Sequence, residues 1–188
     1  MRKFVLVVVL AVLAWIFVVP SCSTQFDCAA APATAHADDN ECPSSLDAAA
    51  NDRAWAAARL ATIQDEDVTT GLLYDGDGGK VTLMSGKDSN SKLADKIIGE
   101  LGGPKLWVAT HVEVKAAAIM REKGISHAVL VINKDDGVCE IDSDGKPRPY
   151  SCQGVVPRIL PEGSTLAVWS PLEIREGGTS VKLKGVVR

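Results

Sequence analysis

This chain of 188 residues has few histidines, a small net charge and no internal repeats. Of its three histidines, His36 lies in the N-terminal region, His127 is expected in a loop or at a strand edge, and His111 belongs to the motif described below. Subtracting the 4 basic and 9 acidic side chains of residues 1–67 from the totals of 20 and 24 leaves 16 basic and 15 acidic in residues 68–188. That balance permits contact with phosphates but does not demand it. The length of 188 residues argues against a two-domain enzyme and favours one domain with an N-terminal extension.

Residues 1–37 are expected to form a targeting segment. Arg2 and Lys3 precede an unbroken apolar run over residues 4–19, and a proline and small residues follow it, which is typical of a signal peptide. The run is somewhat short for a membrane span, which needs about 20 apolar residues. We therefore expect export through a cleavable signal, with a membrane anchor or a lipoprotein modified at Cys22 as alternatives. The membrane would then be contacted only through this segment.

Residues 38–67 are expected to be a linker and a helical extension, and residues 68–188 a single α/β domain. Strand and helix patterns alternate from about residue 68, which indicates a mixed central sheet flanked by helices. The expected strands are 70–74, 80–84, 106–108, 128–132, 165–169 and 181–187. The expected helices are 46–63, 92–101, 111–123 and 154–160.

The most informative pattern joins His111 and Glu113 to Cys139 and Cys152. One imidazole and two thiols can supply three zinc ligands, and a nearby carboxylate can carry protons. Residues two apart face nearly opposite sides of a helix, but at a helix N-terminus both side chains reach past the end of the axis, where the dipole favours anions. Three protein ligands leave a tetrahedral zinc ion one position for a water nucleophile. The pattern therefore predicts a catalytic zinc site with Glu113 as proton carrier.

The alternative for the two cysteines is a disulfide, because disulfides persist outside the cytosol. A bridge between Cys139 and Cys152 would close a hairpin over the turn-rich residues 142–147. The protein would then be an exported binding protein without enzymatic activity. The alternative for His111 and Glu113 is an exposed polar helix start.

Several short motifs within residues 69–171 match a known family. They are His111-Val112-Glu113, the segments 118–121 and 124–126, a first cysteine 28 residues beyond His111, and the segments 160–162 and 168–171 after the second cysteine. On these motifs the stretch resembles the SCP1.201-like bacterial toxin deaminases. The chain departs from the family over residues 140–151, where the family has a much shorter C-x-x-C.

The resemblance implies a three-layer domain like that of cytidine deaminases, and zinc-dependent conversion of cytosine to uracil in DNA. By position, His111, Cys139 and Cys152 would bind Zn²⁺ and Glu113 would be the acid/base residue. The family includes enzymes on double-stranded and on single-stranded DNA, and RNA or free cytidine is a second possible substrate. A deaminase of this kind that is also exported fits an interbacterial toxin, which implies an immunity protein in the producing cell. We expect the protein to be a monomer.

Four further residues are candidates for substrate contact. Arg148 and Tyr150 lie between the cysteines near Lys146, where a cation can contact a phosphate and an aromatic ring can stack on a base. The alternative for this segment is a solvated turn. Trp107 and Ala109 lie just before the His111 motif and are candidates for the pocket lining, although Trp107 also suits the hydrophobic core.

Overall fold

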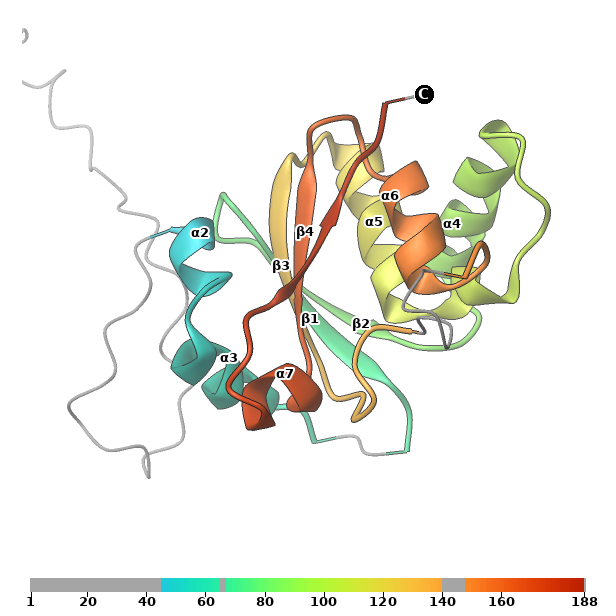
Figure 1. The fold of residues 1–188 in the computed structure, drawn as a ribbon. Coiled ribbons are helices and arrows are strands. Elements are labelled where there is room, and N and C mark those ends of the chain that lie inside the picture. The colour runs from blue at the N-terminus through green and yellow to red at the C-terminus, as the bar shows by residue number, and fades with distance from the viewer. Residues whose placement is uncertain (1–44, 65–66, 140–147, 188) are drawn as a thin grey trace, which may run out of the picture.

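The computed structural model describes residues 45–64, 67–139 and 148–187. The expected targeting segment 1–37 and the linker residues 38–44 lie outside the described residues. Among the described helices, none has the length and apolar character that crossing a bilayer requires. Figure 1 shows three layers, with a sheet between two groups of helices.

The described strands form a mixed sheet of five, in the order β2-β1-β3-β4-β5. They are β1 (Thr70–Asp75), β2 (Lys80–Met84), β3 (His127–Ile132), β4 (Thr165–Trp169) and β5 (Val181–Lys184). β3 and β4 are parallel, and the other neighbouring pairs are antiparallel. The α/β class and the mixed sheet are confirmed, although β5 ends three residues before the expected residue 187.

Helices cover both faces of the sheet (Figure 1). One face is covered by α4 (Ser89–Glu100), α5 (Val112–Lys123) and α6 (Cys152–Ile159). The other face is covered by α2 (Leu46–Ala49), α3 (Arg53–Leu60) and α7 (Pro171–Arg175). A short 3₁₀ helix, η1 (Trp107–Thr110), directly precedes α5.

The central strands bury both faces because successive side chains point to opposite sides. In β3, Leu130 packs into the core beneath α4, α5 and α6, whereas Val129 and Val131 pack beneath α2 and α3. This double burial explains why residues 128–132 form a continuous apolar run, and it confirms the prediction of a buried central strand.

Several expected elements need correction. The helix expected at 46–63 is two helices, because Asp52 caps a new helix start. α4 begins three residues earlier than expected, because Asp88 forms a capping box at its N-terminus. The strand expected at 106–108 is wrong, since these residues enter η1 instead. α6 begins at Cys152 rather than at residue 154, and α7 had no counterpart among the expected elements.

The two N-terminal helices are packed onto the sheet. Trp169 donates its Nε1 hydrogen to the carbonyl oxygen of Ala49 at 3.1 Å, and the Ser180 hydroxyl donates to that of Ala50 at 2.6 Å. Trp55 of α3 meets Tyr74 of β1 edge to face, with ring centroids 5.1 Å apart. α2 and α3 therefore form, together with α7, the helical layer on this face of the sheet.

Candidate functional site

The start of α5 carries two of the predicted site residues. His111 is the N-cap residue, and its side chain makes no capping hydrogen bond, so the imidazole can point away from the helix. Glu113 lies in the first turn and is only 1 % exposed. α5 ends at Lys123, and its C-cap Gly124 has a φ of +67°, a left-handed conformation that glycine adopts without strain. The predicted helix from residue 111 to residue 123 is confirmed to within one residue.

Cys139 and Cys152 come to the same place from two other segments. Cys139 follows β3 and the turn at Gly137, and Cys152 is the first residue of α6. Both cysteines are buried and both are free thiols. The structure therefore does not contain the disulfide that was the alternative for this pair.

The imidazole and the two sulfurs form a cluster of the size that a metal ion requires. Nδ1 of His111 lies 3.2 Å from Sγ of Cys152, and the ligand atoms of His111, Cys139 and Cys152 all lie within 4.8 Å of one another. A tetrahedral zinc ion, with Zn–S of about 2.3 Å and Zn–N of about 2.0 Å, separates its ligand atoms by roughly 3.5 to 3.8 Å. The donor atoms and their spacing therefore fit zinc.

The two thiols hold one negative charge between them. The pKa of Cys139 is lowered to about 4, because Cys152 and then His111 donate hydrogen bonds to its sulfur. The pKa of Cys152 is raised well above its usual value, because this thiol donates to Cys139, is buried, and lies near the carboxylate of Glu113. A bound cation would supply the positive charge that a second thiolate needs.

The carboxylate of Glu113 lies beside this cluster and borders a cavity. Its Oε1 accepts a long hydrogen bond, 3.4 Å, from the backbone N–H of Cys139. Glu113 and His111 line a cavity of about 300 Å³, which we call the Glu113 cavity. Its other lining residues are Thr69, Ser85, Gly86, Thr110, Val112 and Lys134.

A second cavity, of about 310 Å³, lies on the Cys139 side of the cluster, and Trp107, Arg148 and Tyr150 help to line it. Trp107 is 66 % exposed, so its alternative placement in the core is wrong. Its ring makes a T-shaped contact with the His111 ring, with centroids 4.5 Å apart. Tyr150 is also exposed, at 55 %, whereas Ala109 is buried in the core. Three of the four candidate substrate contacts thus gather at one cavity, and Lys146 lies outside the described residues.

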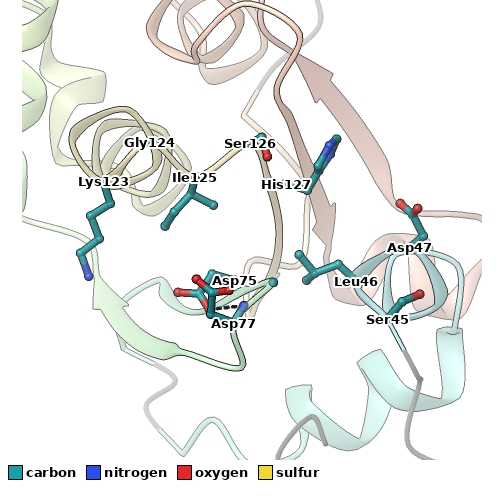
Figure 2. Close-up of a pocket in the computed structure, with 11 residues that line it drawn as sticks. Ser45, Leu46, Asp47, Asp75, Asp77, Lys123, Gly124, Ile125, Ser126 and His127 are labelled. Atoms are coloured by element: carbon teal, nitrogen blue, oxygen red, sulfur yellow. Dashed lines mark hydrogen bonds between the residues drawn. The ribbon is translucent and has the colours of Figure 1, made fainter. Parts of the chain in front are cut away.

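A cavity of about 370 Å³ opens at the other end of β3 (Figure 2). Its lining includes Asp47, Asp75, Asp77, Lys123 and His127. The carboxylate of Asp75 accepts backbone N–H groups of its own hairpin turn, which accounts for it structurally. His127 is exposed at the first position of β3, as predicted. The candidate site therefore stays at the two cavities that adjoin the thiols and Glu113.

The family model of the SCP1.201-like deaminases matches residues 40–187. The chain belongs to this family. No curated protein matches it. The match extends over every described element from α2 to β5. The region shared with the family therefore includes both helical layers as well as the His111 motif. Membership makes this protein a deaminase, and the cluster of His111, Cys139 and Cys152 is where it could hold a metal ion.

In this SCP1.201-like deaminase, most residues that line the Glu113 cavity were not predicted from the sequence. Lys134 lines this cavity and lies in the loop just after the end of β3. Loops at the carboxyl ends of parallel strands often contact ligands, and this rule could have identified Lys134 from the sequence. Ser85 and Gly86 connect β2 to α4. Their position could have been found from the capping sequence at Asp88, which fixes where that connection ends.

Proposed function

We propose that this SCP1.201-like deaminase is a zinc-dependent enzyme that converts cytosine to uracil in DNA. The proposal is carried by one observation, the meeting of His111, Cys139 and Cys152 within metal-ligand distance beside the buried carboxylate of Glu113. A zinc ion held there would supply the Lewis acidity that makes water nucleophilic near neutral pH. The reaction consumes one water molecule and releases the amino group of cytosine C4 as ammonia.

Glu113 is the proton carrier in this proposal. Its carboxylate accepts a proton from the attacking water and passes protons to the ring nitrogen and to the departing amine. The backbone N–H of Cys139 contacts Oε1 and helps to orient the carboxylate. The T-shaped contact between the Trp107 ring and the imidazole limits the rotation of His111.

Exposed aromatic rings beside the cluster favour a nucleic acid over free cytidine as substrate. Trp107 and Tyr150 line one cavity together with Arg148, and stacked bases and backbone phosphates are what such a combination binds. A free nucleoside would need little surface beyond the Glu113 cavity. RNA offers the same kinds of contact and is the second candidate. A base within a duplex would have to flip out to reach Glu113.

The proposal includes an exported interbacterial toxin that acts as a monomer and has an immunity protein as partner. The toxin role rests on the resemblance of the His111 motif and the segments after Cys152 to bacterial toxin deaminases. The charged start and the apolar run within residues 1–37 support export by a signal peptide or an anchor. Production of the protein inside a susceptible bacterium is expected to stop growth and to raise C-to-T mutation. Normal growth without such mutations would reject this role.

The test of the chemistry uses the full chain, loaded with zinc, on single-stranded DNA, double-stranded DNA, RNA and cytidine. We expect one zinc ion per chain and conversion of cytosine to uracil in DNA, read by mass spectrometry. Glu113→Gln keeps the shape and the acceptor for Cys139, so it should retain zinc but lose about 10²- to 10⁴-fold in rate. Full activity in this variant, or a metal-free protein with Cys139 bonded to Cys152, would contradict the proposal. Conversion of RNA or cytidine alone would reject the DNA assignment.

A further inference from the structure

We propose that Lys115 is a positioning residue that fixes one wall of the Glu113 cavity against α5. Lys115 lies two residues beyond Glu113 on the same helix, and its side chain is only 1 % exposed. The inference rests on the proposed function, because this wall matters to substrate only if the Glu113 cavity is the reaction site.

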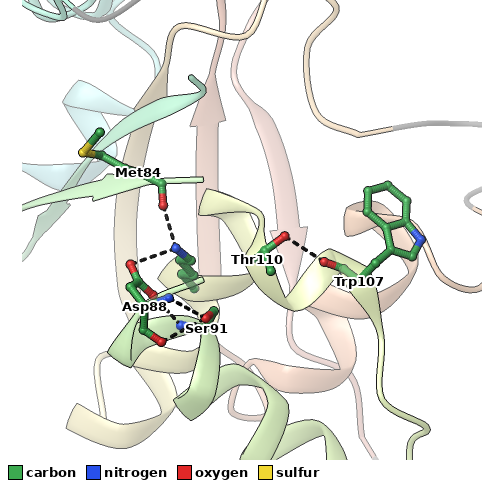
Figure 3. A network of polar contacts seen from close by, with 6 residues as sticks. Met84, Asp88, Ser91, Trp107 and Thr110 are labelled. Atoms are coloured by element: carbon green, nitrogen blue, oxygen red, sulfur yellow. Dashed lines mark hydrogen bonds and ion pairs between the residues drawn. The ribbon is translucent and has the colours of Figure 1, made fainter. Parts of the chain in front are cut away.

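The ammonium group of Lys115 joins three secondary-structure elements at one point. Nζ donates to the carbonyl oxygen of Met84, at the end of β2, at 2.6 Å. It also donates to Oδ2 of Asp88 at 2.8 Å. The other carboxylate oxygen of Asp88 accepts the N–H of Ser91 at 2.7 Å and caps α4. Figure 3 shows Met84, Asp88 and Ser91 gathered around these contacts.

The connection between Met84 and Asp88, the two residues that Lys115 contacts, supplies part of the wall of the Glu113 cavity. Ser85 donates its N–H to the carbonyl oxygen of Thr69 at 2.7 Å, and Gly86 donates to that of Thr110 at 3.0 Å. Ser85, Gly86 and their two partners, Thr69 and Thr110, all line the Glu113 cavity. Both ends of the connection from β2 to α4 are therefore held to α5, and its middle is held to the segments that precede β1 and α5.

Stability alone does not account for a buried lysine here. Desolvating an ammonium group carries a penalty that an ion pair only partly offsets, and a well-packed apolar residue often stabilises as well or better. The buried neighbours of Lys115 on α5 are apolar except for Glu113, namely Val112, Val114, Ala116, Ala117, Ala118, Ile119 and Met120. The ammonium group, unlike an apolar side chain, makes directional hydrogen bonds. These hydrogen bonds fix the position of the 85–87 connection relative to α5.

The test compares Lys115→Met, which keeps most of the side-chain length, with Asp88→Asn, which keeps the ability to cap α4. The matched control is Lys96→Met on α4, which removes an exposed ion pair to Glu100 at 3.6 Å. Two quantities are measured in the zinc-loaded full chain. They are the amide hydrogen exchange of residues 84–88 and the KM for a cytosine-containing oligonucleotide.

We expect Lys115→Met to speed exchange at 84–88 and to raise KM, each about tenfold, since one partner of a partly buried ion pair is lost. Zinc content and exchange in β3 should not change, and Lys96→Met should alter neither quantity. Asp88→Asn should act in the same direction, and it carries the test if Lys115→Met does not fold. Wild-type exchange and KM would overturn the proposal, as would faster exchange throughout the domain, which is the mark of a purely stabilising role. If the unsubstituted chain deaminates none of the cytosine substrates, the proposed function fails, while exchange still decides whether Lys115 holds the wall.

Discussion

Replacing Gly137 with alanine is expected to weaken zinc binding, because the turn at Gly137 positions Cys139. The φ of Gly137 is +76°, a left-handed conformation that costs a non-glycine residue about 1–2 kcal/mol. An added Cβ would lie 3.2 Å from Oε1 of Glu173 and 3.3 Å from Cδ2 of Leu172. Glu173 cannot easily move aside, since its carboxylate accepts the N–H of Ser170 at 3.0 Å in the cap of α7.

The magnitude follows from these two sources of strain. The left-handed φ and mild overpacking together amount to about 2–3 kcal/mol. If the turn relieves about 2 kcal/mol of this strain by shifting Cys139, zinc affinity falls about 30-fold, since about 1.4 kcal/mol corresponds to a factor of ten. Gly163→Ala is the matched control. Gly163 has a similar φ of +74°, but nothing lies within 4 Å of its added Cβ.

Competition with a coloured zinc chelator measures affinity, and thermal unfolding of the metal-free chain measures stability. Both variants should melt lower, by about 2–4 °C for each kcal/mol lost. Only Gly137→Ala should also lose zinc affinity. Wild-type affinity in Gly137→Ala, or an equal loss in Gly163→Ala, would refute the claim that this turn positions Cys139.

Two further predictions concern the aromatic cavity and the thiols. Trp107→Ala and Tyr150→Ala should each weaken oligonucleotide binding by about 1–3 kcal/mol in fluorescence anisotropy. Val187→Ala, at a residue 74 % exposed, should not, and equal affinities in all three would remove the aromatics from the binding surface. In metal-free protein the pKa of Cys139 is lowered to about 4, whereas the pKa of a cysteine in the unfolded chain is about 8.5. The Cys139 thiolate therefore stabilises the folded state fully above about pH 8.5. This stabilisation decreases as the pH falls and is lost below about pH 4. The raised pKa of Cys152 acts in the opposite sense and removes stability above about pH 8.5. Thermal unfolding across this range should therefore show Cys139→Ser losing the rise between pH 4 and 8.5, and an unchanged pH profile would contradict the assignment.

Elements with strong local signals could be predicted from the sequence. Gly124 ends α5 because glycine alone adopts its left-handed φ without strain, and the apolar run 128–132 is explained by burial on both faces of β3. Residues 106–108 gave the wrong element, because three apolar residues suit a strand as well as a turn. There the backbone N–H of His111 donates to the carbonyl oxygen of Val108 at 2.9 Å, which is the hydrogen bond between residues three apart that defines a 3₁₀ turn.

The types of residue at the candidate metal cluster could be predicted, but the surroundings of the cluster could not. Residue type and spacing show that His111 and two cysteines can share an ion. They do not show that Trp107 is exposed against His111, because exposure depends on what the rest of the chain leaves uncovered. Lys115 gives a sharper case. A lysine in an alanine-rich helix suits a solvated face, and only the contacts with β2 and α4 reveal its burial.

The long interval between the cysteines is compatible with one metal centre, because each cysteine is anchored by a different segment. Cys139 is held by the turn at Gly137, which packs on α7, and by its N–H bond to Glu113. Cys152 opens α6, where Ser151 accepts the N–H of Gly154 at 3.2 Å and the helix packs against α5. In a C-x-x-C arrangement one short turn must place both sulfurs. Here each sulfur is placed by its own segment, so a longer interval between the cysteines does not prevent them from sharing one ion.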